Sequence, residues 1–500
     1  MAIENELRVV LLLFVVWTTE LACSRINVSP IIGQIAAGIA VGPALLDLIP
    51  HVEAFKLLGK LGVMLLVVES GLAVDIEDIR RFGARASLAA ATGVITPTLL
   101  SFALYSGGLR AGWKAALAVG AAISPTSLGF SAQLLGEVGQ LTTPIGQLIC
   151  TAAVIDDVLS LLLLAEVQAL GDDNTKWHKY AVPVLASIGS VMVGTLAALF
   201  ISSKAEPLGA WLSSLNKIKD NMDDSNSNID HLPSPRSSME LEAVTRHHYL
   251  TPDEQSLRTT TGRAATDRFT TAARLGAGLA DPTPGAVSRV GGASVGSVGR
   301  GDRVLLAMVL AASLLFAYLS SLVGSSDLLG CFLGGLAFAA VPGVQRIWGR
   351  QMKRYTRWGA RLFFSATVAF SVPSIYKDGG LLRPEPFWKG LVLTFAAILG
   401  KLVVGFYARP LTLSGFLKLG WAMNGRGEFS FFIAQEASDE GILTTEDYSA
   451  VVWALLLSSI ASPVFFRRAL MKQDSNGDLS STDRRIVEQA ATGGDVDATV

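Results

Sequence analysis

Long apolar runs alternate with short polar stretches along most of the chain. Before a long polar insert, seven such runs lie near residues 7–23, 31–49, 57–73, 86–105, 112–134, 144–170 and 181–202. After the insert, six more lie near residues 303–323, 326–341, 360–376, 388–409, 414–437 and 448–468. Only helices and closed barrels satisfy every backbone hydrogen bond in lipid, and continuous apolar runs favour helices. The pattern therefore predicts an all-α polytopic membrane protein with about 13 transmembrane helices.

Composition supports this prediction. Of the 500 residues, 50% are hydrophobic and only 17% are charged, and the mean hydropathy is +0.45. Soluble domains carry about 25% charged residues, so a soluble enzyme, a secreted disulfide scaffold and a disordered protein are excluded. A formal net charge of −1 gives no reason to expect a nucleic-acid partner. The 3 cysteines lie in apolar runs without metal-ligand spacing, and we expect no cofactor and no enzymatic activity.

Polar stretches divide the chain into four parts. We predict a first transmembrane half over residues 1–202, an insert over 203–302, a second transmembrane half over 303–470 and a tail over 471–500. The insert and the tail lack a sustained hydrophobic period, so we predict that both are disordered. The composition of the insert suits a regulatory segment and suits a tolerated linker equally well.

Basic residues predict the orientation in the membrane. They cluster in alternate connections: Arg80, Arg81 and Arg85, then Arg346, Arg350, Lys353, Arg354, Arg357 and Arg361, and finally Arg467, Arg468 and Lys472. Basic loops face the cytoplasm. This places the N-terminus outside and the C-terminus and insert in the cytoplasm, in either a plasma or an organelle membrane. Carboxylates near span ends, such as Glu166, Glu436 and Asp327, are expected at the membrane interface.

An internal repeat relates the two halves. Residues 31–40 align with residues 328–337 and share three positions, namely Gly33 with Gly330, Gly38 with Gly335, and Ala40 with Ala337. These segments are the second and ninth predicted spans, and an odd separation means that they cross the membrane in opposite directions. The same offset pairs the fifth span with the twelfth, and both are interrupted by polar residues. The sequence thus predicts two inverted-topology repeats with two discontinuous crossing helices, as in secondary transporters.

The two interruptions have different chemistry. In the fifth span a proline stands among three hydroxyl residues, in the order Ser124, Pro125, Thr126 and Ser127. Proline removes a helical hydrogen bond, and the hydroxyls can satisfy or ligate nearby groups. In the twelfth span Arg426 stands between two glycines, followed by Glu428, which predicts a break with a buried charge pair. A simple proline kink and an interfacial loop are the structural alternatives.

Charged residues also occur inside apolar runs. Asp156 and Asp157 lie near the middle of the sixth span, where one charge costs at least ~2.5–3.5 kcal/mol. Adjacent carboxylates repel and titrate as a coupled pair, which suits proton exchange. Lys401 lies midway along the eleventh span, too central to snorkel easily, so we predict a pair with Asp156 or Asp157. Glu69, near the cytoplasmic end of the third span, lines an entrance funnel or lies at the interface.

Taken together, these residues resemble the cation/proton antiporter superfamily, specifically its second branch, the sodium- or potassium-for-proton exchangers with paired aspartates. The matching stretches are Pro30 to Gln34 with Gly38, Gly42 and Pro43, then residues 124–127, residues 143–157, the span with Gly330, Gly334 and Gly335, Lys401, and residues 424–429. They cover both halves but not the insert. One departure is Ala73, which follows Gly71 and Leu72 where the family usually has a carboxylate.

The resemblance implies a secondary active transporter that exchanges Na⁺ or K⁺ for protons by alternating access, and a homodimer. It implies that Asp157 is the main cation and proton carboxylate, with Na⁺ or K⁺ bound there transiently. Asp156 would pair with Lys401 and release it when the cation binds. The remaining residues would support the helix breaks: Thr126 and Ser127 at the crossing, with Ser124 and Pro125, and Arg426 with Glu428 at the second break.

Two other functions stay open at this point. A sodium-coupled organic-solute symporter of similar fold would need a large polar cavity, in which Lys401 beside two aspartates would be hard to explain. A non-transporting ion sensor could signal through the Arg-containing insert, but it would not need a titratable carboxylate pair. The glycine face formed by Gly33, Gly38 and Gly42 suits either a dimer contact or an internal helix contact.

Overall fold

The computed structural model describes residues 2–25, 29–108, 111–171, 178–214, 299–374 and 379–475. All regular secondary structure in these ranges is helical, which confirms the predicted all-α class. Eight helices in this part of the chain are long and apolar enough to cross a membrane. Two shorter apolar helices, α2 (Pro30–Val41) and α12 (Asp327–Phe338), accompany them. The count of about 13 spans stays a prediction.

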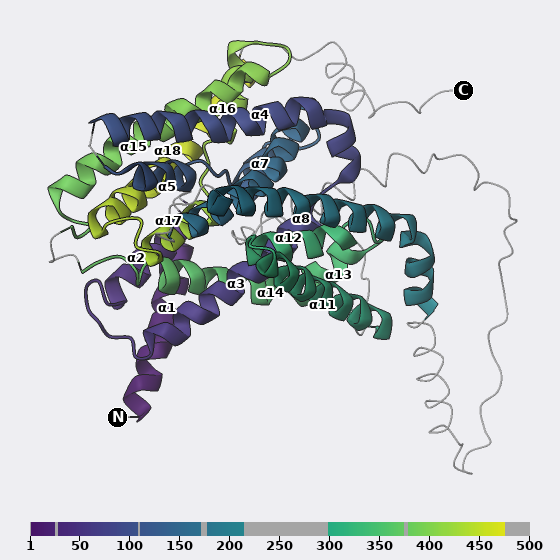
Figure 1. Cartoon of the computed structure of the whole chain (residues 1–500), viewed down its shortest axis with the longest axis horizontal. Helices are drawn as coiled ribbons and strands as arrows, with labels where there is room; N and C mark the ends of the chain where they lie inside the picture. The colour runs from purple at the N-terminus through teal and green to yellow at the C-terminus, as the bar shows by residue number, and fades with distance from the viewer. Residues whose placement is uncertain are drawn as a thin grey trace, which may run out of the picture.

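The helices form two bundles, and each bundle takes helices from both halves of the chain (Figure 1). The first bundle contains α1 (Ala2–Arg25), α2, α3 (Val52–Leu72), α11 (Arg300–Leu322), α12, α13 (Val344–Gln351), α14 (Lys353–Leu362) and η3 (Phe363–Val368). The second contains α4 (Ile76–Ala103) with η1 (Leu104–Gly108), α5 (Trp113–Ile123), α6 (Leu128–Glu137), α7 (Pro144–Leu170), α15 (Pro384–Leu402), η4 (Val403–Tyr407), α16 (Leu413–Ala422), α17 (Glu428–Asp439) and α18 (Thr445–Ser475). Helix α8 (His178–Ser203) contacts both bundles through α12 and α7.

Contacts in one half recur in the other. Helix α1 packs on α2 as α11 packs on α12, and α4 packs on α7 as α15 packs on α18. The aligned glycines occupy equivalent contacts, because a Cβ at Gly33 would meet the backbone of α1 and one at Gly330 would meet that of α11. Likewise Gly38 lies against the backbone of η3, and Gly335 against that of α3. The face with Gly33 and Gly38 is therefore an internal helix contact.

Several assignments made from the sequence differ from the structure, including the first residues of the predicted disordered tail, because α18 runs to Ser475. Helix α4 begins at Ile76, so residues assigned to a cytoplasmic loop continue the helix. Arg361, also assigned to a basic loop, is 6% exposed on α14, because it reaches a carboxylate on α1 instead of water. Residues 205–214 of the insert are helical, with Leu208 and Leu212 packed on the hydrophobic core. Residues 215–298 and 476–500 lie outside the described residues.

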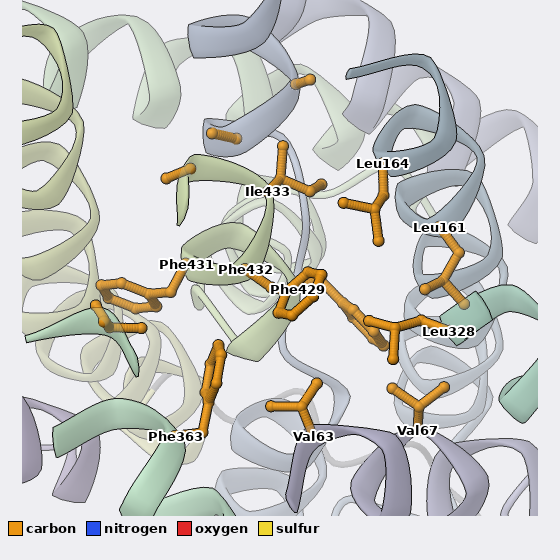
Figure 2. Close-up of a cluster of buried hydrophobic side chains, with 14 of the residues drawn as sticks. Val63, Val67, Leu161, Leu164, Leu328, Phe363, Phe429, Phe431, Phe432 and Ile433 are labelled. Carbon is orange, nitrogen blue, oxygen red and sulfur yellow. The ribbon is translucent and has the colours of Figure 1, made fainter. Parts of the chain in front are cut away.

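Apolar side chains fill the space between the two bundles (Figure 2). We call this cluster the interbundle layer; its members include Val63 and Val67 of α3, Leu161 and Leu164 of α7, Leu328 of α12, Phe363 of η3, and Phe429, Phe432 and Ile433 of α17. The rings of Phe363 and Phe432 meet across the bundles with their centroids 5.8 Å apart. The layer is mainly apolar, with a hydrogen bond from the Tyr448 hydroxyl to the Val368 carbonyl at 3.0 Å crossing between the bundles.

Candidate functional site

The two helix breaks lie against each other. The first separates α5 from α6 and the second separates α16 from α17. The backbone N–H of Ser127 donates to the carbonyl of Gly425 at 2.8 Å, and the Thr126 hydroxyl donates to the carbonyl of Met423 at 3.0 Å. One turn into α6, the Ser131 hydroxyl donates to the carbonyl of Ala422 at 2.7 Å. Polar groups left without helical partners by one break are thus satisfied by the other, and the predicted discontinuous crossing helices are confirmed.

A fully buried ion pair lies beside the crossing. Lys401 Nζ and Asp156 Oδ1 are 2.9 Å apart, and both side chains are 0% exposed. Lys401 also donates to the Thr126 hydroxyl at 2.7 Å. The backbone N–H of Thr126 donates to the other carboxylate oxygen, Asp156 Oδ2, at 2.6 Å. The three residues therefore form a closed set in which α7 and α15 are held to the first break, and both carboxylate oxygens of Asp156 are occupied.

Asp157 is buried but has no such partner. Its residue is 3% exposed, and no hydrogen bond or ion pair joins its carboxylate to another residue in the described part of the chain. Asp156, Glu428 and Lys401 are close enough to act on it electrostatically. When Asp156, Asp157 and Lys401 are all ionised, two negative charges and one positive charge leave −1. Asp157 thus offers carboxylate oxygens to a cation or a proton.

Arg426 does not bind Glu428. Its guanidinium crosses to the first break and donates to the carbonyls of Ser124 and Pro125, each at 3.4 Å, and to the carbonyl of Ala397 at 3.0 Å. The Ser124 and Pro125 carbonyls directly follow the C-terminal end of α5, where a positive charge is favoured. The charge pair expected between Arg426 and Glu428 is therefore absent among the described contacts, and the arginine stabilises the opposite break.

Glu69 is half-buried at the inner part of the first bundle. The indole N–H of Trp348 donates to its carboxylate at 3.3 Å, and Thr356 is a second hydrogen-bond partner. Glu428, near the site, and Lys353, in the basic segment, both act on it electrostatically. Glu69 thus lies between the centre and the basic end, which is compatible with an entrance funnel.

Sequence reasoning missed two ion pairs. Glu20 and Arg361 form a buried pair in the first bundle, and Lys60 pairs with Glu436 between the bundles. Glu436 was expected at the membrane interface, but it is 8% exposed. Lys60 lies inside the third apolar run, and a lysine in such a run indicates a nearby carboxylate, as it does for Lys401. Its partner is 376 positions away, which the sequence pattern does not indicate.

The chain matches a known family and several known proteins. The family model described as sodium/hydrogen exchanger, transmembrane, matches residues 9–219 and 295–472. The chain is 23% identical to the Na⁺/H⁺-K⁺ antiporter GerN of Bacillus cereus over 461 residues, which are 90% of this chain and 92% of GerN. It is 28% identical to the high-affinity Na⁺/H⁺ antiporter NhaS3 of Synechocystis over 224 residues, 36% of this chain and 48% of NhaS3.

A solved structure has the same fold. It is the sodium proton antiporter MjNhaP1 from Methanocaldococcus jannaschii, which this chain matches with a TM-score of 0.52 and 13% sequence identity. The match covers 93% of this chain and 99% of that one. At this identity the likeness supports the arrangement of the helices, and the chemistry of the site rests on the residues described above.

Proposed function

Because the chain belongs to the sodium/hydrogen exchanger transmembrane family, we propose that it exchanges Na⁺ or K⁺ for protons at Asp157. Members of this kind are integral membrane transporters and not enzymes, in line with the antiporter names of the relatives. The proposed site consists of Asp157 with the pair of Asp156 and Lys401. Thr126 and Ser127 border it at the crossing of the broken helices.

The observation that carries this proposal is the contrast between two neighbouring aspartates. Asp156 is held by Lys401 and Thr126, whereas Asp157 has no hydrogen-bond partner among the described residues. A buried carboxylate without a partner is costly as an anion, because burial removes its hydration. Binding a proton or binding a cation removes that cost, and only one of the two fits at a time. Competition between them at Asp157 couples the two fluxes.

Alternating access completes the proposed cycle. The second bundle carries the site, and the first bundle meets it largely through the apolar side chains of the interbundle layer. Polar contacts between the bundles include the ion pair of Lys60 with Glu436 and the hydrogen bond of Tyr448 to the Val368 carbonyl. A sliding or rocking motion between the bundles would expose Asp157 to one side and then to the other. When a cation reaches the site, it competes with Lys401 for Asp156, so Lys401 can release a proton. We therefore propose two protons per cation and net movement of charge.

Proton flux in proteoliposomes tests the proposal. A pH-sensitive dye trapped inside should report alkalinisation or acidification after pulses of Na⁺, K⁺ or Li⁺, and the ion giving the largest signal is the preferred substrate. Asp157→Asn should abolish the response, whereas Glu53→Gln, which removes an exposed carboxylate of the first bundle, should not. A symporter would give no proton flux without an organic solute, and a sensor would bind ions without any flux.

The remaining organisation is proposed on the same basis. We propose that the basic end faces the cytoplasm, with the N-terminus outside, and that the chain forms a homodimer. The family match stops at residue 219 and resumes at residue 295, which supports the insert as an addition between two transmembrane halves.

A further inference from the structure

One ion pair joins a helix of the first bundle to a helix of the second, at a distance from Asp157. Lys60 of α3 lies in the first bundle, and Glu436 of α17 lies in the second. Lys60 Nζ and Glu436 Oε1 are 3.0 Å apart, with side chains 41% and 11% exposed. The amide of Gln168, on α7, donates to the other oxygen of Glu436 at 3.4 Å. One carboxylate therefore connects three helices of two bundles.

One face of α7 runs from Asp157 to this ion pair. Asp157, Leu161, Leu164 and Gln168 are spaced by four, three and four residues, so they line one side of the helix. The rise of an α-helix separates the first from the last by about 16 Å. Along this face, the two leucines of the interbundle layer follow Asp157, and Gln168 with its hydrogen bond to Glu436 follows the leucines. We take this face as one wall of the transport route.

The surroundings of Lys60 favour a cation. Glu436, Asp439 and Asp327 all attract its ammonium group electrostatically. These carboxylates come from both bundles, α17 on one side and α12 on the other. When the bundles separate at this end, the Lys60 contact with Glu436 must break, because α3 packs mainly on α12 and α14 of its own bundle and moves with them. An approaching cation would meet the acidic groups that Lys60 leaves.

We propose that the Lys60–Glu436 ion pair is a latch that holds the transport route closed at the Gln168 end and opens once in each exchange cycle. The inference rests on the proposed function, since a latch matters only if the bundles move. Lys60 and Glu436 are then positioning residues: they set how often the route opens and do not bind the transported ion at Asp157. Removing the latch favours the state open at this end, while restoring it with reversed charges restores closure.

Thiol accessibility tests the latch directly. In a background with Cys23, Cys150 and Cys331 replaced by serine, Leu164→Cys places a thiol in the interbundle layer behind the latch. The rate of its modification by a membrane-impermeant maleimide is measured from each side of reconstituted vesicles. Lys60→Met should raise the rate from the Gln168 end about two- to fivefold, as expected for losing a partly exposed ion pair. The charge exchange Lys60→Glu with Glu436→Lys should return it toward the starting value.

Two matched variants serve as controls. Lys56→Met removes a lysine one turn away on α3, whose partner Glu53 is on the same helix. Lys389→Met removes an ion pair between helices of the second bundle, where Lys389 of α15 binds Glu446 of α18. Both should leave the labelling rate unchanged. An unchanged rate in Lys60→Met, equal increases in the controls, or no recovery in the charge-exchange variant would overturn the latch.

Cation binding separates failure of the latch from failure of the proposed function. Lys60→Met should keep the rise in Tm caused by Na⁺ or K⁺, and Asp157→Asn should lose it. If Asp157→Asn keeps that rise and exchanges normally, the proposed site is wrong, whatever the labelling shows. If Asp157→Asn is inactive but Lys60→Met labels like the parent, only the latch is wrong.

Discussion

Two buried ion pairs, one in each bundle, are alike in burial and charge but differ in the chemistry of the cation and in the groups around it. In the second bundle Lys401 and Asp156 are 2.9 Å apart and fully buried. In the first bundle Arg361 binds Glu20, with guanidinium nitrogens 2.5 and 2.9 Å from the two carboxylate oxygens. Each pair joins a helix of the first half to a helix of the second half.

The difference lies in the cation and in what surrounds it. The guanidinium of Arg361 binds Glu20 in a bidentate manner and lies 4.6 Å from the centroid of the Trp358 ring. The amide of Gln34 donates a further hydrogen bond to Glu20. A guanidinium does not lose its proton in proteins, so this pair is permanent. Lys401 makes one contact with Asp156, and an ammonium group can release a proton. Beside it lies Asp157, the carboxylate proposed above to bind the cation. Burial alone therefore does not mark a transport site.

The largest expected effect comes from removing one cation. Lys401→Ala leaves Asp156 buried without its counter-charge, which costs ~3–5 kcal/mol of stability. We expect a strongly lowered Tm in detergent and no proton flux in proteoliposomes. Arg361→Ala should lower the Tm by a similar amount, but protein that remains folded should still exchange. If both variants lost the same share of exchange activity per amount of folded protein, the two ion pairs would not differ in their role in transport.

Asp156→Asn should have an intermediate effect. The amide keeps the shape of the side chain and an acceptor for the N–H of Thr126, but it loses the attraction for Lys401. We expect lower thermal stability, residual exchange because Asp157 is intact, and less net charge moved per cation. Currents recorded on a supported membrane, normalised to proton flux, measure that charge. An unchanged ratio of charge to flux would show that Lys401 takes no part in proton release.

Replacing both members of a pair sharpens the comparison further. A buried ion pair exchanged for apolar residues of similar volume is often neutral or stabilising by about 1–4 kcal/mol. The double variant Glu20→Leu with Arg361→Met should therefore recover most of the Tm lost in Arg361→Ala and should exchange at nearly the parental rate. Loss of exchange in a double variant of normal Tm would contradict a purely structural role for this pair.

The smallest effect is expected outside both bundles. Replacing residues 215–298 with a short flexible linker keeps the helical residues 205–214 and the start of α11 at Arg300. The shortened chain should insert into membranes and exchange cations, with a shifted dependence on pH if the insert is regulatory. Failure to insert would mean that the insert is structural.

The sequence was sufficient for the all-helical class and for the two breaks, because both follow from local features. Apolar runs mark the spans, and Pro125 and the glycines around Arg426 mark the interruptions. Charges in apolar runs pointed to Asp156, Asp157 and Lys401 for the same reason. Which aspartate pairs with Lys401 was open, since the answer depends on the Thr126 backbone N–H that holds Asp156.

The partners of other charges were not predictable, because they depend on how distant helices pack. The basic residues around Arg361 predict a loop, although the Arg361 side chain turns inward to Glu20. The short spacing of Arg426 and Glu428 favours a pair between them, yet Arg426 binds carbonyls of the opposite break. In both cases the residues next to the arginine in the sequence did not indicate the group that it binds in the folded chain.

Cation binding as a function of pH tests the central claim most directly. In purified protein, the rise in Tm caused by Na⁺ or K⁺ is measured at several concentrations and pH values, for the parent chain and for Asp157→Asn. If protons and cations compete for Asp157, the apparent affinity of the parent should weaken as the pH falls, by up to about tenfold per pH unit for one competing proton. Asp157→Asn should show no cation-induced rise at any pH. A pH-independent affinity in the parent, or an undiminished rise in Asp157→Asn, would contradict exchange at this carboxylate.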